Sequence, residues 1–134
     1  MPLILLSIVT GASLGALLRF GLAEAFNHIW PNLPLGTLAA NLLGAFIMGL
    51  TLASFLAMPN LPIAWRLFLT TGFLGGLTTF STFSAEAFLL LQRGEATAVA
   101  IHIAAHVVGS LASTALGFAT ARALWRLAAP GLTP

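Results

Sequence analysis

The sequence predicts an all-α integral membrane protein with four membrane-spanning helices in one domain, residues 1–134. Of its 134 residues, 59% are hydrophobic and only 6% are charged. A soluble domain carries about a quarter charged residues, so this composition is typical of a chain surrounded by lipid. Cys is absent, which excludes disulfides and thiol chemistry. The few arginines form no basic patch, so we expect no nucleic-acid partner.

Four apolar segments are long enough to cross a hydrocarbon core of roughly 30 Å, which takes about 20 helical residues. They run from about Leu3 to Phe26, Pro34 to Ala57, Ala64 to Gln92 and Ala96 to Leu127. Short connections containing Pro, Asn or Gly separate them, as is typical of turns. We expect the first segment to remain as a helix, because no basic residue precedes it and Arg19 interrupts it, unlike a signal peptide.

The charges indicate no clear orientation in the membrane. Arg66, Arg122 and Arg126 would share one side with the N-terminus, and Arg93 would lie on the other. This difference in positive charge between the two sides is too small for the positive-inside rule to predict one orientation. Two alternatives stay open at this point: one orientation prevails, or the chain inserts both ways and pairs antiparallel with itself.

Two small-residue motifs favour close helix packing. Gly11-x-x-x-Gly15 lies in the first segment and Gly72-x-x-x-Gly76 in the third. Glycines four residues apart allow two helix backbones to approach. A tightly packed bundle of this size has little interior for polar groups, so we expect the chain to oligomerise.

The most unusual stretch is Gly75-Gly76-Leu77-Thr78-Thr79-Phe80-Ser81-Thr82-Phe83-Ser84 in the third segment. Hydrocarbon holds no water for such polar groups, so they must be buried in protein or line a wet path. Paired glycines and threonines are poor helix formers, and we expect a break in the helix at mid-membrane. Carbonyls freed there would need a donor or a cation. The alternative is that the hydroxyls bond back to their own helix.

The last segment carries a slowly winding polar band, with four residues spaced by four: His102, His106, Ser110 and Thr114. We expect His102 at the membrane interface and His106 deeper. A metal at the two histidines is not expected, since no acid stands beside them on this helix.

Three further polar residues have two interpretations each. Asn41 in the second segment either joins helices or donates its amide N–H to an anion. Arg19 either extends to the nearer interface or marks the mouth of an anion path. Glu86 is expected to bond to hydroxyls or to lie in a wet vestibule.

No catalytic arrangement is present in the sequence, because no nucleophile is accompanied by a base and an orienting acid. We therefore expect no enzyme. Neutral hydrogen-bonding groups at membrane depth favour a passage for something small.

These motifs together resemble the Fluc (CrcB-type) fluoride channels of bacteria. The resemblance covers nearly the whole chain and rests on three patterns: Gly11-x-x-x-Gly15-x-x-x-Arg19, Gly36-Thr37-Leu38 followed by Asn41, and the run from Gly75 to Ser84. It implies an antiparallel homodimer of dual topology in the bacterial inner membrane, with two pores. Fluoride would leave the cytoplasm passively through them, which reduces its toxicity.

The resemblance also implies roles for individual residues. Phe80 and Phe83 would present ring edges to fluoride, and Asn41 would donate its amide. Arg19 would lie near the vestibule. A structural Na⁺ at the dimer interface would bind the backbone carbonyls that match Gly75 and Thr78. The remaining pathway residues form a polar track with a histidine beside it: Ser81, Thr82, Ser84, Ser110, Thr114 and His106.

Two other classes of membrane protein also have four spans. A small dual-topology multidrug exporter needs an acid embedded in its first helix, where this chain has Arg19, with Glu24 near the end. A haem-binding anchor subunit needs histidines on facing helices, whereas His102 and His106 share one helix.

Overall fold

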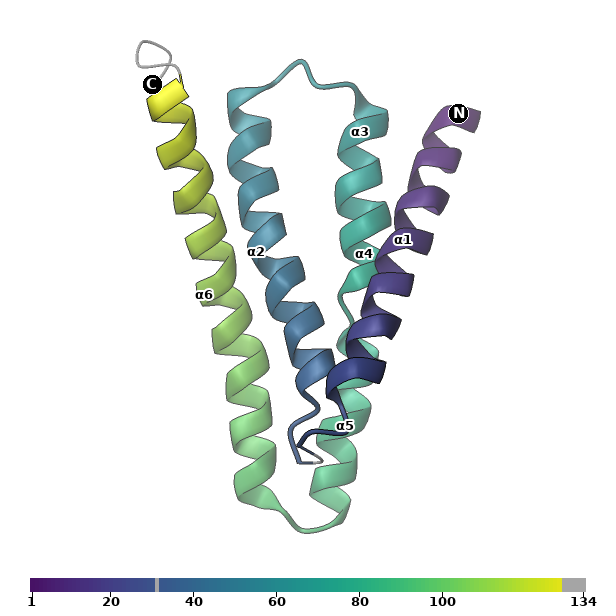
Figure 1. Ribbon diagram of the computed structural model, residues 1–134, viewed down its shortest axis with the longest axis vertical. Helices are drawn as coiled ribbons and strands as arrows, with labels where there is room; N and C mark the ends of the chain where they lie inside the picture. The colour runs from purple at the N-terminus through teal and green to yellow at the C-terminus, as the bar shows by residue number, and fades with distance from the viewer. Residues whose placement is uncertain (31, 129–134) are drawn as a thin grey trace.

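The computed structural model describes residues 1–30 and 32–128, and every regular element in these ranges is a helix (Figure 1). Four helical stretches are long and apolar enough to cross a membrane. This confirms the all-α class and the four predicted spans, whose ends agree to within one residue. The elements are α1 (Pro2–Phe26), α2 (Leu35–Ala57), α3 (Ile63–Leu67), the π-helical η1 (Phe68–Leu74), α4 (Gly75–Leu77), α5 (Phe80–Gln92) and α6 (Ala96–Ala128).

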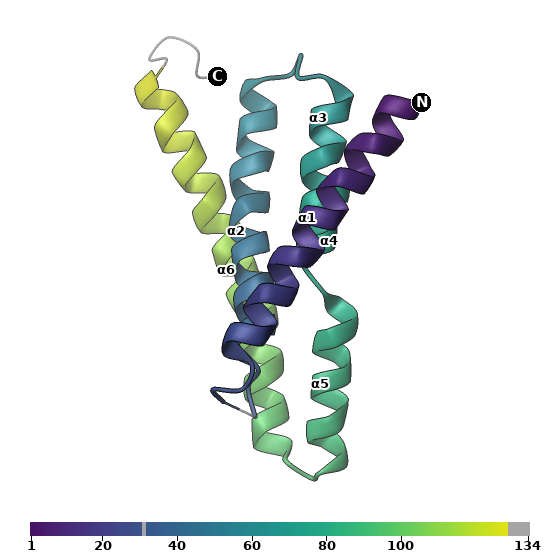
Figure 2. The same ribbon diagram turned by 45° about the vertical axis from the view of Figure 1, so that its right-hand side comes forward.

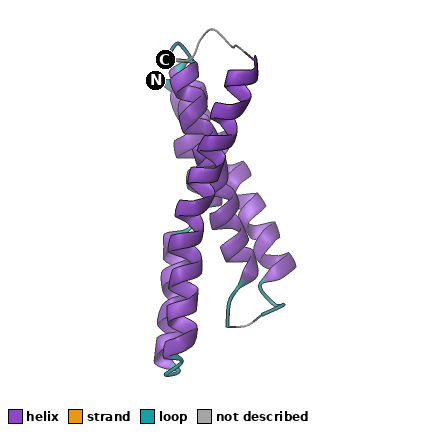
Figure 3. Ribbon diagram, turned by 90° about the vertical axis from the view of Figure 1, so that its left-hand side faces the viewer, coloured by secondary structure: helices purple, strands orange, loops and turns teal. Residues whose placement is uncertain are grey.

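The chain passes along the molecule four times in alternating directions, so Met1 and the end of α6 lie at the same end (Figure 1). The α2 helix packs along α6, and α1 crosses η1 and α4 at an angle (Figure 2). At the opposite end, the turn between α5 and α6 extends beyond the connection from α1 to α2 (Figure 3). The α5–α6 hairpin thus forms a separate arm of the bundle.

Both predicted glycine motifs lie at one helix contact. A Cβ added at Gly11 would come within 2.8 Å of the Phe73 backbone nitrogen, and one at Gly72 within 2.8 Å of the Ile8 carbonyl. Such distances are far inside ordinary van der Waals contact, so only glycine allows the two backbones to approach this closely. The predicted tight packing is confirmed, and it occurs between α1 and the third stretch of the same chain.

A second glycine contact joins α2 to α6. A Cβ at Gly49 would lie 2.7 Å from the backbone nitrogen of Phe118, and one at Gly117 would lie 3.1 Å from that of Leu50. Because each glycine faces the partner backbone, the two helices interlock on both sides. This contact fixes α6, and with it His106, against α2.

The third stretch leaves helical geometry at two residues. Thr78 and Thr79 are extended, with φ, ψ of −83°, 155° and −148°, 118°. The helix resumes at Phe80, where Thr79 caps it by accepting a hydrogen bond from the Thr82 backbone N–H at 3.1 Å. An oxygen at this position satisfies one of the N–H groups that a helix start leaves without a partner. Two helical parts therefore meet end to end at a short extended link.

The interior of the single chain is small and apolar side chains cover its outside. A central cluster of Ala40, Leu74 and Leu77 is almost fully buried. Large side chains such as Leu17, Leu56 and Leu111 are more than half exposed. In a bilayer this exposure carries no hydrophobic penalty, because the lipid tails around the protein are themselves apolar. Five polar side chains of the described residues are buried, and Thr79 and His106 among them adjoin the link; the full set is Thr37, Thr51, Thr79, His102 and His106.

Candidate ion pathway

A cavity of about 450 Å³ lies beside the extended link, between α2, the third stretch and α6. Its lining contains most of the residues that the sequence assigned to the pathway and to the cation site: Asn41, Gly75, Thr78, Phe80, Phe83, His106, Ser110 and Thr114. Thr82 and Arg19 line a second cavity, and Ser81 and Ser84 are exposed side chains that line neither of the two.

Asn41 holds the extended link in place. Its Oδ1 accepts a hydrogen bond from the Thr79 N–H at 2.7 Å, and its Nδ2 donates to the Thr79 carbonyl at 3.1 Å. This pair of bonds replaces the helical partners that Thr79 lacks and fixes which way the Asn41 amide faces. Asn41 is thus a helix-to-helix joint, one of the two roles expected from the sequence.

The same amide determines the proton position on His106. The second N–H of Asn41 faces His106 Nδ1, with 3.0 Å between the nitrogens. An amide NH₂ only donates, so Nδ1 must be the acceptor and a neutral ring carries its proton on Nε2. Both N–H groups of Asn41 are therefore engaged within the chain.

Aromatic rings form a continuous wall on one side of this cavity. The Phe80 and Phe83 ring centroids are 5.5 Å apart, so the two rings share a face as predicted. Phe83 also contacts His106, with 4.8 Å between centroids. Phe83 is buried, whereas Phe80 is 78% exposed in the single chain. The wall is consequently open on the Phe80 side.

Polar bonds extend from this region into a second network at the α5–α6 arm. The Thr37 hydroxyl donates to Glu86 Oε1 at 2.6 Å and accepts from the Asn27 amide at 3.3 Å. Glu86 Oε2 lies 3.6 Å from His102 Nε2, which also approaches the Phe83 carbonyl at 3.3 Å. The expectation that Glu86 bonds to a hydroxyl is confirmed.

The prediction of an interfacial His102 is wrong. Its side chain is fully buried and stacks on Phe83, with 5.2 Å between ring centroids and 13° between ring planes. No acid stands beside the two histidines on α6, as expected, but Glu86 approaches them from α5. The short Arg93–Glu95 turn was the signal in the sequence that α5 and α6 would face each other.

A second cavity, of about 220 Å³, lies between α1 and the start of α5. Arg19 lines it together with Asn27, Thr37, Thr79 and Thr82. Thr79 also lines the first cavity, so this residue stands between the two spaces. Thr79 is not among the site residues expected from the sequence, although it lies at the centre of the motif.

Several backbone carbonyls lose their helical partners at the link, and those of Gly75 and Thr78 are among them. In a continuous helix the N–H groups of Thr79 and Thr82 would bond to the carbonyls of Gly75 and Thr78. Here Thr79 N–H donates to Asn41 Oδ1, and Thr82 N–H donates to the Thr79 hydroxyl. The Gly75 and Thr78 carbonyl oxygens are thus available as ligands for a hard cation.

Hydroxyl groups in the region bond within their own helix, to one another or to a neighbouring helix. Thr78 Oγ1 donates back to the Leu74 carbonyl of its own helix at 2.9 Å, which is the local alternative that the sequence left open. Thr79 Oγ1 donates to Thr82 Oγ1 at 2.9 Å, forming a short hydroxyl chain. Thr114 Oγ1 bonds to the Ala45 carbonyl at 3.1 Å and so ties α6 to α2. Ser110 lies half-buried on the cavity wall.

The arrangement defines a class of membrane protein: a small helical bundle with a cavity lined by aromatic rings and hydroxyls beside an interrupted helix. Comparison with known families agrees. The profile of the family described as CrcB-like protein, Camphor Resistance (CrcB), matches residues 6–118. The chain belongs to this family, which confirms the resemblance drawn from the motifs.

Relatives in several bacteria match the chain over most of its length. The fluoride-specific ion channel FluC of Tolumonas auensis is 54% identical over 121 residues, covering 90% of this chain and 95% of the relative. The protein of the same name from Chromohalobacter salexigens is 54% identical over 127 residues, covering 95% and 96%. The four spans and these relatives place the chain in the bacterial inner membrane as a multi-pass protein.

Proposed function

We propose that this protein is a fluoride-selective channel through which fluoride leaves the cytoplasm passively, which lowers its toxicity. The observation that carries the proposal is the cavity beside the extended link, where aromatic rings, hydroxyls and an amide converge without a Lys or Arg. The relatives named fluoride-specific ion channels support the identity of the ion.

The chemistry of the cavity suits a small anion. Fluoride is strongly hydrated, so it enters only where other groups replace its water. A phenyl ring carries partial positive charge at its edge, and Phe80 and Phe83 offer such edges. A fixed cation at the narrowest point would hold the ion too tightly, whereas conduction requires entry and release to be balanced.

Asn41 would bind fluoride by turning one hydrogen bond from His106 to the ion. Its bonds to Thr79 fix the amide, and its second N–H contacts His106. Fluoride beside Phe80 would take that N–H from His106, whose own Nε2–H offers another donor. The neutral amide thus supplies a hydrogen bond without adding charge. We place Ser110 and Thr114 further along this wall, with Ser81, Thr82 and Ser84 on the hydroxyl-bearing start of α5.

An inverted second copy would complete the passage. Phe80 and Gly75 are exposed in the single chain although they line the cavity. The charges favour neither orientation strongly, which suits insertion in both. We infer an antiparallel homodimer with two passages, in which the link at Thr78 and Thr79 lies at mid-membrane depth. Arg19 in the second cavity would stand at the wide mouth.

A structural Na⁺ fits the link. The Gly75 and Thr78 carbonyls have lost their helical donors, and Na⁺ prefers neutral oxygen ligands of this kind. Equivalent carbonyls from the inverted copy would complete its coordination. Bound at the interface, the ion would contribute positive potential near the passage without an ionised side chain.

The decisive test is fluoride efflux from liposomes, followed with a fluoride electrode. Phe80→Ile and Phe83→Ile replace ring edges with aliphatic groups of similar bulk. We expect efflux to fall by more than about tenfold while the variants still elute as the wild-type dimer, because an entry step loses over about 1.4 kcal/mol of ion stabilisation. Phe88→Ile, on the exposed side of α5, is the control and should conduct normally.

Wild-type efflux from the Phe80 and Phe83 variants would refute their role. Failure of the wild-type protein to move fluoride at all would refute the channel itself. A small multidrug exporter is the less favoured class, because the acid of α1, Glu24, is exposed near the helix end and Arg19 lies further inside.

A further inference from the structure

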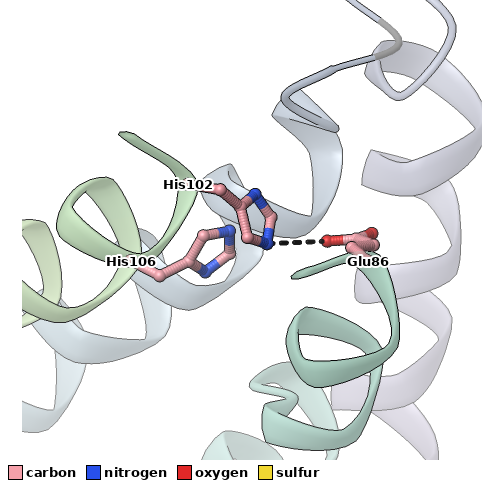
Figure 4. A group of neighbouring side chains, drawn as sticks. All are labelled: Glu86, His102 and His106. Atoms are coloured by element: carbon pink, nitrogen blue, oxygen red, sulfur yellow. Dashed lines mark ion pairs between the residues drawn. The ribbon is translucent and has the colours of Figure 1, made fainter. Parts of the chain in front are cut away.

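A compact group of ionisable side chains lies in the α5–α6 arm, beside the proposed fluoride path, and shares His106 with it. It contains Glu86 from α5 and His102 and His106 from α6, where the two histidines are one helical turn apart. In Figure 4 the two imidazole rings lie next to each other and His102 faces the Glu86 carboxylate. One nitrogen or oxygen from each residue lies within 4.8 Å of the other two.

Three atoms of this cluster lack hydrogen-bond partners although they are buried. They are Glu86 Oε2, His102 Nδ1 and His106 Nε2. His102 is 0% exposed and His106 is 4% exposed, so solvent does not satisfy their ring nitrogens. A buried polar atom without a partner is unfavourable by roughly 1–3 kcal/mol. Two of these atoms, Glu86 Oε2 and His106 Nε2, belong to groups that lie beside His102 Nε2, which indicates that a ligand is accommodated between the three side chains.

The composition and spacing match a metal site. Two histidines at i and i+4 with a carboxylate from another helix are a known ligand set for Zn²⁺. With bonds of about 2.0–2.2 Å, two ligands of a tetrahedral zinc stand roughly 3.4 Å apart. Glu86 Oε2 and His102 Nε2 are 3.6 Å apart. The ligand atoms of the three residues all lie within 4.8 Å of one another, so closing around a zinc ion requires a shift of about an ångström.

We propose that Glu86, His102 and His106 form a binding site for Zn²⁺, which shares His106 with the proposed fluoride path and is separate from the carbonyl site for Na⁺. Imidazole nitrogens and a carboxylate suit zinc better than Na⁺, Mg²⁺ or Ca²⁺, which prefer oxygen ligands alone. The three residues supply three ligands and leave a fourth position for water.

The site is coupled to the link through Asn41. Zinc at His106 Nε2 takes the place of the proton there, and a neutral ring then carries its proton on Nδ1. That proton faces the Asn41 N–H, so zinc binding breaks the Asn41–His106 hydrogen bond. Thr37, which bonds to Glu86 Oε1, stays in place and orients the carboxylate.

The test is Zn²⁺ binding to the untagged, purified full-length protein in fluoride-free buffer, measured by titration calorimetry. We expect one Zn²⁺ per chain. Glu86→Gln and His102→Gln each remove one zinc ligand and keep a similar side-chain volume. Each should raise the Kd for Zn²⁺ by more than about tenfold, because losing even a residue that only hydrogen-bonds to a ligand weakens metal binding by that much. His28→Gln is the matched control, because His28 is exposed in the turn after α1.

A second measurement uses the wild-type protein alone and does not depend on the folding of variants. Co²⁺ in place of Zn²⁺ should give the visible absorption of a four-coordinate nitrogen and oxygen site, and added Zn²⁺ should abolish it. The proposal is overturned if the wild type binds no Zn²⁺ and shows no such Co²⁺ spectrum. It is equally overturned if Glu86→Gln and His102→Gln bind Zn²⁺ as the wild type does, or if His28→Gln alone loses binding.

Discussion

At the scale of single residues, Asn41 is the most connected side chain of the site. One amide bonds to both backbone groups of Thr79 and to the ring of His106. The sequence could show that an Asn at membrane depth needs partners. It could not show which partners, because helical periodicity gives the face of a residue and says nothing of the neighbouring helix.

The exchange of a donor for an acceptor at Asn41 should be severe. In Asn41→Asp the atom that faces the Thr79 carbonyl and His106 Nδ1 becomes an oxygen, so two attractive contacts become repulsive. We expect fluoride efflux from liposomes to fall by more than about tenfold, as for loss of a buried hydrogen bond to a charged group. Asn60→Asp, in the exposed connection before α3, makes the same chemical change and should conduct as the wild type. Equal efflux from the two variants would contradict the role given to Asn41.

At the scale of helices, the glycine contacts are the most demanding feature. The first and third stretches touch through backbone atoms at Gly11, Gly15, Gly72 and Gly76. This much followed from the sequence, since small residues four apart predict close approach. Their spacing did not show that the two motifs would meet each other within one chain.

Gly15→Ala should therefore destabilise the protein. The added methyl would stand 2.7 Å from the Leu77 backbone nitrogen, and backbone atoms cannot rotate away. We expect a loss of about 1–3 kcal/mol, as for overpacking of a core. Gly21→Ala places the same methyl on the same helix with nothing within 4 Å, so it should be neutral or slightly stabilising. Thermal unfolding in detergent, followed by loss of the folded protein's peak on size exclusion, compares the two. Equal thermal stability would show that the α1 contact tolerates a side chain.

The helix boundaries were predictable for a physical reason that does not extend to the site. Hydropathy integrates over about 20 residues, so single substitutions hardly alter it. The contact of Glu86 with His102 depends instead on how α5 and α6 face each other across one turn. Pairwise geometry of this kind is determined by packing, which a single sequence does not specify.

At the scale of the whole molecule, the proposed inverted pairing has a direct test. The chain has no Cys, so one introduced Cys is the only thiol. Asn60→Cys and His28→Cys place a thiol at opposite ends of the bundle, each exposed. For dual topology, an impermeant maleimide added outside sealed vesicles should label about half of each variant. Complete labelling of one variant and none of the other would show a single orientation and exclude the antiparallel dimer.

The link at Thr78 and Thr79 has a further electrical consequence. Peptide dipoles give a helix partial positive charge at its start and partial negative charge at its end. Here the end of one helical run, Ile63–Leu77, faces the start of another, Phe80–Gln92. One interruption of the backbone therefore presents both polarities a few residues apart. The halide would approach the start of α5 and the alkali ion the end of α4, so a neutral stretch of chain can attract two opposite ions without a single charged side chain between them.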